Sequence, residues 1–531
     1  MTTGKRTGIG RWLGVLGALA LSLALIAPWH ATPVPSSLPT SAHAGFFDDD
    51  LEIFEEVLDL VSGNYVYPPD YKTLFETSIQ GMIAKVPEKT LTVTDVYSGQ
   101  VLKKDSARLS YRLSFSRHEN MEAFRSVYYF LANQYQGQLK KKDIEQAAII
   151  GLMSSLDPYS LYMDKDDFER SMRDTEGQYG GVGMVITMED LKLTVVRTLK
   201  NSPAERAGIL PKDVISQVDG QTVKGMQINE LAERLRGYPN TKVQIQVFRP
   251  STNSTQEITL TREIISIETV EYKNMGDGVG YLSINSFSKQ TNDQLQVALN
   301  QALEEGVTAF IMDLRNNPGG LLSQSVKVAS HFLNKGELIV YTRGRDRNDM
   351  QTYQALYKNT LTHLPLVVLI NKQSASASEI VAGSLKDSGK ALILGETSYG
   401  KGSVQTIFRM SDGSGLRLTT SKYYTPSGID INQHGITPEI IVEKDLPQGT
   451  EGEAPREPKG AKKDPAPLAR NLATRLKETE LIDYLKQKGY TNTDSIDPLV
   501  EFAKLVVRDS QHPSKSHALA KARELAKDIH Y

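Results

Sequence analysis

The chain has no cysteine among its 531 residues. This absence excludes disulfide bonds, zinc sites built from thiolates and cysteine nucleophiles. The chain also lacks an excess of either charge, because 61 Lys and Arg residues oppose 63 Asp and Glu residues to give a formal net charge of -2. Such a balance argues against a nucleic-acid partner. Any catalysis must rest on Ser, Thr, Asp, Glu, Lys or His, and we expect no metal and no cofactor.

Long apolar runs are missing from the chain after its N-terminal segment. No stretch there reaches the roughly 20 apolar residues that a membrane helix needs. The N-terminus has basic residues ahead of an apolar run at 12–27, followed by a Ser/Pro-rich stretch that ends in Ser-Ala-His-Ala. This order predicts a signal peptide over residues 1–44 and an exported protein, periplasmic or otherwise extracytoplasmic. If the segment stays uncleaved, it would instead associate the protein with the membrane.

A chain of this length predicts several domains. Residues 45–176 contain two similar segments, which begin at Ile53 and Ala123 and have the apolar spacing of helical hairpins. A duplication would explain the similarity, and so would a chance likeness of two amphipathic hairpins. Between them, residues 87–120 alternate Thr, Val, Tyr and Leu with polar residues, which predicts a small β insertion.

The rest of the chain divides by its patterns. Residues 177–264 hold short strand patterns around one helical stretch and predict a small β-rich module. Strands and helices alternate over 265–446, which predicts an α/β core with parallel pairing. Pro, Gly, Glu and Lys dominate 447–468 and predict a disordered linker. Apolar residues at helical spacing predict a helical C-terminal segment over 469–531.

Ser376 lies in the first segment with a catalytic pattern. An apolar strand at Leu366–Ile370 runs into a turn of small residues, and a helix is expected to start near Ser378. Backbone N–H groups and the helix dipole point outward at such a turn and can stabilise an oxyanion. The alternative is a structural helix start that Ser378 caps.

A second strand, from Thr308, ends in a turn that contains Gly319 and Gly320. This turn can bring another backbone N–H to the same place, and one oxyanion donor is typically worth about 3 to 4 kcal/mol of transition-state stabilisation. The alternative is a Pro-Gly-Gly turn without a catalytic role.

Lys401 stands in a glycine-flanked loop after a third strand, with Gln405 four residues later. A buried lysine has a lowered pKa and can act as a base toward a serine, and Gln405 can hold its amine by a hydrogen bond. A phosphate-binding loop is disfavoured because Gly402 occupies its Ser/Thr position. A histidine base is also disfavoured, because neither His331 nor His434 has an evident Asp partner.

The β-rich module contains a glycine loop followed by an apolar strand. Consecutive N–H groups of such a loop can bind a terminal carboxylate, and the peptide then adds as a strand beside the module. The alternative is a β-sandwich without a ligand. The predicted peptide-binding residues are Gly181, Val182, Gly183, Met184, Val185 and Ile186.

Seven motifs follow one another along residues 53–445: LMSSLDPYSLYM, YGGVGMVI, SPAERAGILPKDVI, GYLSINSFS, DLRNNPGG, SASASE and GETSYGKGSVQ. In this order they resemble the carboxyl-terminal processing, or tail-specific, protease family, whose members are PDZ-containing serine peptidases. The resemblance implies an α/β fold with a ClpP/crotonase-like core, an inserted PDZ β-sandwich domain at 177–264 and flanking helical segments. The 87–120 insertion, the second hairpin and the C-terminal helices depart from the commonest family pattern.

The resemblance also implies roles for single residues. Ser376 would be the nucleophile, Lys401 the general base and Gln405 the residue that orients the base. The oxyanion hole would use the backbone of Ala377 and of Gly319 or Gly320, a choice that the sequence leaves open.

We therefore expect a serine endopeptidase that recognises the C-terminus of unfolded substrates and cleaves through an acyl-enzyme. Its expected partners are protein or peptide substrates with a free C-terminus, with a homo-oligomer and an adaptor protein as further candidates. A noncatalytic PDZ scaffold that delivers ligands to a partner protease is the alternative. A trypsin-like PDZ protease is a third reading, which the missing His/Asp pair disfavours.

Overall fold

The computed structural model describes residues 50–531, apart from 88–89, 98, 190–191, 347, 359, 433, 444–472, 491–495, 511, 513 and 530–531. The predicted signal peptide at 1–44 and the predicted linker at 447–468 lie outside the described residues, so both stay predictions. None of the described helices is long and apolar enough to span a bilayer.

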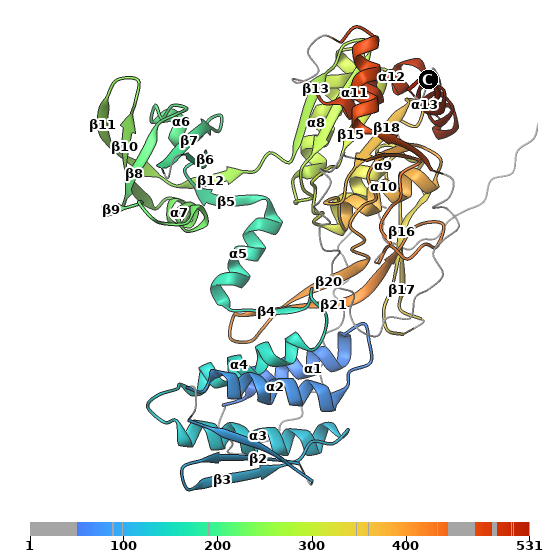
Figure 1. Cartoon of the computed structure of the whole chain (residues 1–531). Helices are drawn as coiled ribbons and strands as arrows, with labels where there is room; N and C mark the ends of the chain where they lie inside the picture. The colour runs from blue at the N-terminus through green and yellow to red at the C-terminus, as the bar shows by residue number, and fades with distance from the viewer. Residues whose placement is uncertain are drawn as a thin grey trace, which may run out of the picture. The chain divides into compact units, whose positions relative to one another are not determined.

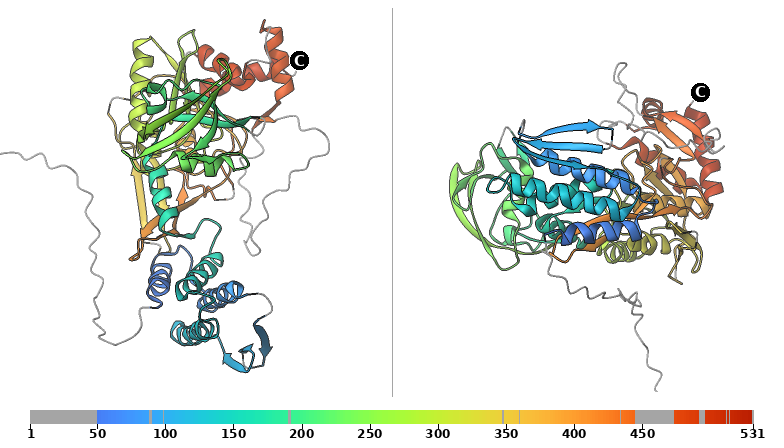
Figure 2. Two further views of the ribbon diagram at one scale, coloured as in Figure 1. Left: turned by 90° about the vertical axis from the view of Figure 1, so that its left-hand side faces the viewer. Right: turned by 90° about the horizontal axis from the view of Figure 1, so that it is seen from below.

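The N-terminal part of the described chain forms four helices and a three-stranded sheet. These elements are α1 (Glu52–Asn64), α2 (Tyr71–Lys85), β1 (Thr92–Val96), β2 (Gly99–Lys104), β3 (Ala107–Tyr111), α3 (Arg117–Gln134) and α4 (Lys141–Ser154). Asp70 and Ser116 cap α2 and α3, because their side-chain oxygens accept hydrogen bonds from N–H groups of the first turn. Figure 2 shows the four helices side by side, with the strands along one side of the bundle.

Residues that match between the two similar segments meet inside this bundle. The rings of Phe54 and Phe124 stack with their centroids 4.0 Å apart. Gly81 and Gly151 face each other, and a Cβ on either would stand 2.3 Å from a carbonyl oxygen of the opposite helix. The main helix packing therefore joins α2 to α4, not the two helices of one predicted hairpin. The duplication stays a hypothesis, which this symmetric packing supports.

A β-rich module follows strand β4 (Leu161–Met163) and helix α5 (Lys165–Glu176). Its elements are β5 (Gln178–Gly181), β6 (Met184–Glu189), β7 (Lys192–Thr198), α6 (Pro203–Arg206), β8 (Val214–Val218), β9 (Gln221–Thr222), α7 (Ile228–Leu235), β10 (Lys242–Arg249), β11 (Ser254–Thr261) and β12 (Glu263–Ser266). The sheet has the order β11-β10-β8-β7-β6, so β6 is an edge strand. Strands β5 and β12 pair antiparallel where the chain enters and leaves the module.

The α/β core contains a seven-stranded sheet in the order β13-β14-β15-β18-β19-β22-β23, which is parallel from β14 to β23. The strands of the core are β13 (Val270–Asn274), β14 (Val279–Ile284), β15 (Ala309–Asp313), β16 (Leu338–Arg343), β17 (Met350–Gln354), β18 (Leu366–Ile370), β19 (Leu392–Gly395), β20 (Ser403–Arg409), β21 (Gly415–Tyr424), β22 (Ile440–Glu443) and β23 (Thr474–Lys477). Its helices are α8 (Thr291–Glu304), α9 (Leu322–Ser330), α10 (Ala377–Asp387), α11 (Glu478–Gln487), α12 (Pro498–Asp509) and α13 (Lys515–Ile529).

Helices cover both faces of this sheet (Figure 1). Helices α8, α9 and α10 bury one face, and α11, α12 and α13 bury the other. Because both faces are covered, every residue of β15 and β18 is buried, which explains why β18, and β15 up to its last residue Asp313, are continuous apolar runs. The carboxyl ends of these two parallel strands lie at one edge, and the turns that contain Gly319 and Ser376 follow directly.

A second sheet has the order β17-β16-β21-β20, and β4 pairs with β21. Strand β20 follows the loop that carries Lys401, so this sheet connects that loop to the residues just before the β-rich module.

The C-terminal segment, predicted as helical, contains three helices and also one strand. It begins with strand β23, which pairs in parallel with β22 and so extends the core sheet. Its helices then bury apolar side chains of β15, β18 and β19 that water would otherwise reach. The apolar spacing of 469–531 indicated helices correctly, but it gave no sign of which surface they would cover.

Candidate active site

Ser376 stands in a strained turn between strand β18 and helix α10. It is the N-cap of α10 and has φ 56° and ψ -113°, a region that side-chain-bearing residues rarely adopt. A sharp strand-to-helix turn of this kind presents a nucleophilic serine, with the N–H of the next residue beside it as an oxyanion donor. Ser376 is 7% exposed, so the hydroxyl lies in a largely dry site.

The turn after β15 packs directly against this serine. A Cβ built on Gly319 would stand 2.8 Å from Ser376 Cβ and 2.9 Å from Ala377 N. The buried Asn317 joins the two turns, because its carbonyl accepts hydrogen bonds from Ala375 N and from Ser378 Oγ, both 3.0 Å long. The sequence-predicted glycine turn and serine turn therefore form one unit.

The hydrogen bonds of the two glycines differ. The N–H of Gly319 donates to Asn317 Oδ1 over 2.8 Å. Among the described residues we find no acceptor for the N–H of Gly320 or of Ala377. Gly320 bridges in parallel to Phe287, whose carbonyl a Cβ at Gly320 would meet at 2.2 Å. Of the two glycines, Gly320 thus has the N–H that is available to a substrate oxygen.

A buried glutamate connects the serine turn to the lysine loop. The Oε2 atom of Glu379 accepts hydrogen bonds from Ser376 N (2.7 Å) and Lys401 N (2.9 Å). Its Oε1 atom accepts from Ser398 Oγ (2.5 Å) and Gly400 N (2.7 Å). Burial raises the pKa of Glu379, although these four donors act in the opposite direction. The backbones at Ser376 and Lys401 are thus held together by one side chain.

The side chains of the predicted dyad point to other partners in this conformation. Lys401 Nζ lies 4.9 Å from the centroid of the Tyr159 ring. Burial raises the pKa of Tyr423, and its interaction with the Ser376 side chain opposes that rise. No hydrogen bond between Lys401 Nζ and Ser376 Oγ occurs in the described part of the chain.

Lys401 nevertheless has the environment that a basic amine requires. Burial lowers its pKa, and the nearby positive charge of Arg417 lowers it further. The carboxylates of Asp157 and Glu379 act against this shift by favouring the ammonium form. The net direction is toward a neutral amine.

Gln405 lies near the dyad on strand β20. Its amide donates to Ser403 Oγ over 2.8 Å and to Thr419 Oγ1 over 3.4 Å. Thr419 Oγ1 in turn donates to Asp157 Oδ1 over 3.0 Å. The predicted contact between Gln405 and the Lys401 amine is absent from the described contacts, so its orienting role stays a prediction.

The predicted peptide-binding loop lies between strands β5 and β6. The side chains of Val182 and Met184 are buried in the core of the module, so these two residues have only backbone groups to offer a ligand. Val185 on the edge strand is 38% exposed. Gly183 has φ 73°, and its carbonyl accepts hydrogen bonds from Leu199 N and Ser202 Oγ. These bonds fix the loop and leave the edge of β6 open.

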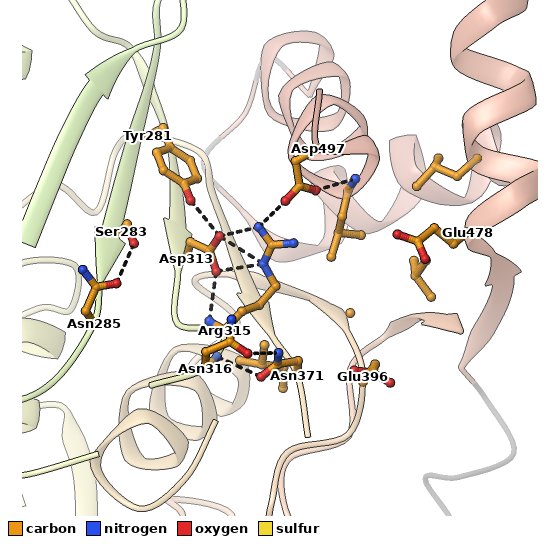
Figure 3. A pocket seen from close by; sticks show the side chains of 15 residues that line it. Tyr281, Ser283, Asn285, Asp313, Arg315, Asn316, Asn371, Glu396, Glu478 and Asp497 are labelled. Carbon is orange, nitrogen blue, oxygen red and sulfur yellow. Dashed lines mark hydrogen bonds and ion pairs between the residues drawn. The ribbon is translucent and has the colours of Figure 1, made fainter. Parts of the chain in front are cut away.

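A separate cavity of about 390 Å³ opens at the carboxyl ends of β14, β15 and β18, and neither Ser376 nor Lys401 lines it. Figure 3 shows Arg315 between Asp313 and Asp497. The Arg315 guanidinium donates hydrogen bonds to both carboxylates and so links the end of β15 to the start of helix α12. Tyr281 Oη also donates to Asp313, over 2.7 Å. No group of acidic, histidine or cysteine side chains in the described chain has a metal-binding arrangement.

Sequence reasoning missed two residues of this site. Glu379 has no role in the sequence analysis, although a Ser followed three residues later by Glu is the pattern of a capping box. Asn317 follows the strand end in DLRNNPGG and gave no distinct signal. Both act on segments distant in sequence, which a local pattern cannot show.

Three known family patterns match the chain. Peptidase family S41 matches residues 278–442, and a PDZ domain matches residues 194–249. The N-terminal domain of the activating protease CtpB matches residues 88–167. The matches to S41 and PDZ confirm the predicted fold class of an α/β protease core with an inserted PDZ domain.

Curated relatives agree with these matches. A carboxy-terminal-processing protease of Bartonella bacilliformis is 41% identical over 340 residues, which are 63% of this chain and 78% of that protein. A CtpA-like serine protease of Staphylococcus aureus is 37% identical over 326 residues, which are 61% of this chain and 65% of that protein. Among solved structures, the photosystem II D1 C-terminal processing protease is 28% identical with a TM-score of 0.41, over 74% of this chain and 93% of that one. The chain belongs to the carboxy-terminal-processing proteases of peptidase family S41, serine-type peptidases, and carries a PDZ domain.

Proposed function

We propose that this serine peptidase binds the free C-terminus of unfolded or disordered proteins with its PDZ domain and cleaves them internally through a Ser376–Lys401 dyad. One observation carries the proposal. The Glu379 carboxylate accepts hydrogen bonds from the backbone N–H of Ser376, which lies in the strained turn packed against Gly319, and from the backbone N–H of Lys401. This arrangement supports the proposal because it holds the backbone of the proposed nucleophile beside the backbone of a lysine whose pKa is lowered.

Substrate capture is assigned to the edge strand β6 and the loop before it. The N–H groups of Val182 and Gly183 have no acceptor among the described residues and would bind the terminal carboxylate. The last residues of the substrate would then pair with β6 as an added strand, and Val185 would contact their side chains. An unfolded chain fits this mode, because a folded C-terminus has no free strand to pair.

The chemical step uses the neutral amine of Lys401 as a general base. The amine takes the proton from Ser376 Oγ as this oxygen attacks a peptide carbonyl, and the N–H groups of Ala377 and Gly320 stabilise the oxyanion. The Lys401 ammonium then gives its proton to the leaving amine, and a serine ester remains. Water hydrolyses the ester with Lys401 again as base, and Gln405 orients the amine. For this step the Lys401 amine must move from the Tyr159 ring toward Ser376.

The test incubates the purified chain and its Ser376→Ala variant with one disordered protein, prepared with a free or an amidated C-terminus. We expect cleavage by the chain that retains Ser376 and none by the Ser376→Ala variant. The amidated substrate should have a much higher KM, because amidation removes the charge of the terminal carboxylate. Ser388→Ala, at the far end of the same helix, is the matched control and should cleave normally.

Three outcomes would each contradict a different part of the proposal. Cleavage by the Ser376→Ala variant refutes the nucleophile. Equal KM values for the two substrates refute recognition of the carboxylate. Peptide binding without hydrolysis by the unchanged chain would favour the PDZ scaffold.

A further inference from the structure

The segments that carry Ser376 and Lys401 lie 25 positions apart in the chain and come together at Glu379. Three of its four partners are backbone N–H groups, which can only donate a hydrogen bond. The fourth, the hydroxyl of Ser398, accepts a hydrogen bond from Ile436 N over 2.7 Å and so directs its own hydrogen toward Glu379. Both carboxylate oxygens are therefore fully used as acceptors.

We infer that Glu379 is a positioning residue for catalysis, whose carboxylate sets the distance between the serine turn and the lysine loop. This inference rests on the dyad proposed above and adds the residue that assembles it. Glu379 touches neither substrate nor the reacting atoms; it acts through the backbones of Ser376, Gly400 and Lys401.

The folding cost of this group supports a functional role. Glu379 is 0% exposed, and burial raises its pKa in spite of four donors. A group with a raised pKa in the folded state opposes folding when it is ionised at neutral pH. An apolar side chain would fill the same space without that cost, but it could not join the two loops.

Glutamine is the informative replacement. It has nearly the same shape but only one acceptor oxygen, and its amide N–H groups would face donors. Each oxygen of Glu379 accepts at least one backbone N–H, so either orientation of the amide leaves a buried N–H unpaired. The lysine loop should then separate from the serine turn.

The matched control is Glu439→Gln. Glu439 also accepts a backbone N–H in the core, from Ile393 over 3.0 Å, and forms an ion pair with Lys515. Both variants thus lose a carboxylate that holds backbone, but only Glu379 is bonded to the catalytic loops.

Two measurements test the inference on the full chain. With a disordered peptide that has a free C-terminus, Glu379→Gln should lower kcat by about 10²-fold, the effect of a misplacement near 1 Å, and leave KM within about twofold. Hydrogen exchange followed by mass spectrometry should show at least about tenfold faster exchange at Ser376, Gly400 and Lys401, because hydrogen bonds to a charged acceptor are lost. Glu439→Gln should keep its kcat and leave exchange at Ser376, Gly400 and Lys401 unchanged, because its one remaining acceptor oxygen can still hold the Ile393 N–H.

Unchanged kcat in Glu379→Gln, or the same kcat loss in Glu439→Gln, overturns the inference. If Glu379→Gln does not fold, Ser398→Ala replaces it in the test, because this variant removes one of the four donors to Glu379. It should lower kcat by less than about 10²-fold and should speed hydrogen exchange at Gly400 and Lys401. An unchanged Ser398→Ala protein then overturns the inference. The exchange measurement needs no peptidase activity, so failure of the proposed dyad, seen as cleavage by Ser376→Ala, is distinguishable from failure at Glu379.

Discussion

Gly319 lies directly against Ser376: a methyl group added to the glycine would stand 2.8 Å from the Cβ of the serine. Carbon atoms in contact are normally about 3.5–4.0 Å apart, so no side chain fits there unless one of the turns moves. The spacing of the oxyanion donors thus depends on the absence of a side chain at one position.

Gly319→Ala should therefore lower kcat/KM by about 10²-fold or more, comparable to losing an oxyanion donor. Gly306→Ala is the control, because Gly306 also has a positive φ, of 76°, but has open space around it. It should cost about 1–2 kcal/mol of stability through its backbone conformation alone and keep normal activity. Peptide hydrolysis and urea unfolding of both variants decide the matter, and a fully active Gly319→Ala protein would contradict the tight packing.

Lys401→Arg should be as inactive as Lys401→Ala. A guanidinium stays protonated at any pH at which the protein is folded, so it cannot take the serine proton. Lys386→Arg is a suitable control, since burial also lowers the pKa of Lys386, but its amine donates to the Thr437 carbonyl in a structural contact. Initial rates of peptide cleavage measure the effect. Substantial activity in Lys401→Arg would show that another group is the base.

The pH dependence of kcat/KM should follow the deprotonation of Lys401, so activity should rise with pH. Because Arg417 lowers the pKa of Lys401, Arg417→Gln should raise that pKa and move the rising limb to higher pH. A pH profile of both proteins gives the two midpoints. A shift to lower pH, or none, would contradict the assignment of this limb to Lys401.

Phe502→Ala should destabilise the core strongly. Phe502 on helix α12 is 0% exposed within the cluster that covers β15 and β18, and truncation of a buried Phe costs about 3–5 kcal/mol. Phe115, at 79% exposure, is the control, and its replacement by Ala should change stability by less than about 0.5 kcal/mol. Urea unfolding measures both. Equal stabilities would mean that the C-terminal helices do not support the core in solution.

The sequence pointed to several parts of the site because their signals are local. An apolar strand, a small-residue turn and a helix start are contiguous around Ser376. The small residues next to Lys401 likewise predict that its side chain is packed closely. The choice between Gly319 and Gly320 was not readable, because it depends on which N–H the Asn317 side chain already binds.

The sequence by itself determined the alternation of strands and helices in the core, the position of the serine turn and the family of the chain, because each rests on contiguous residues. Only the tertiary structure decided that Glu379 joins Ser376 to Lys401 and that the C-terminal segment completes the core sheet. Both depend on hydrogen bonds and apolar faces between segments far apart in the chain. Such contacts form and contribute to stability only after the parallel sheet has brought the ends of its strands to one edge.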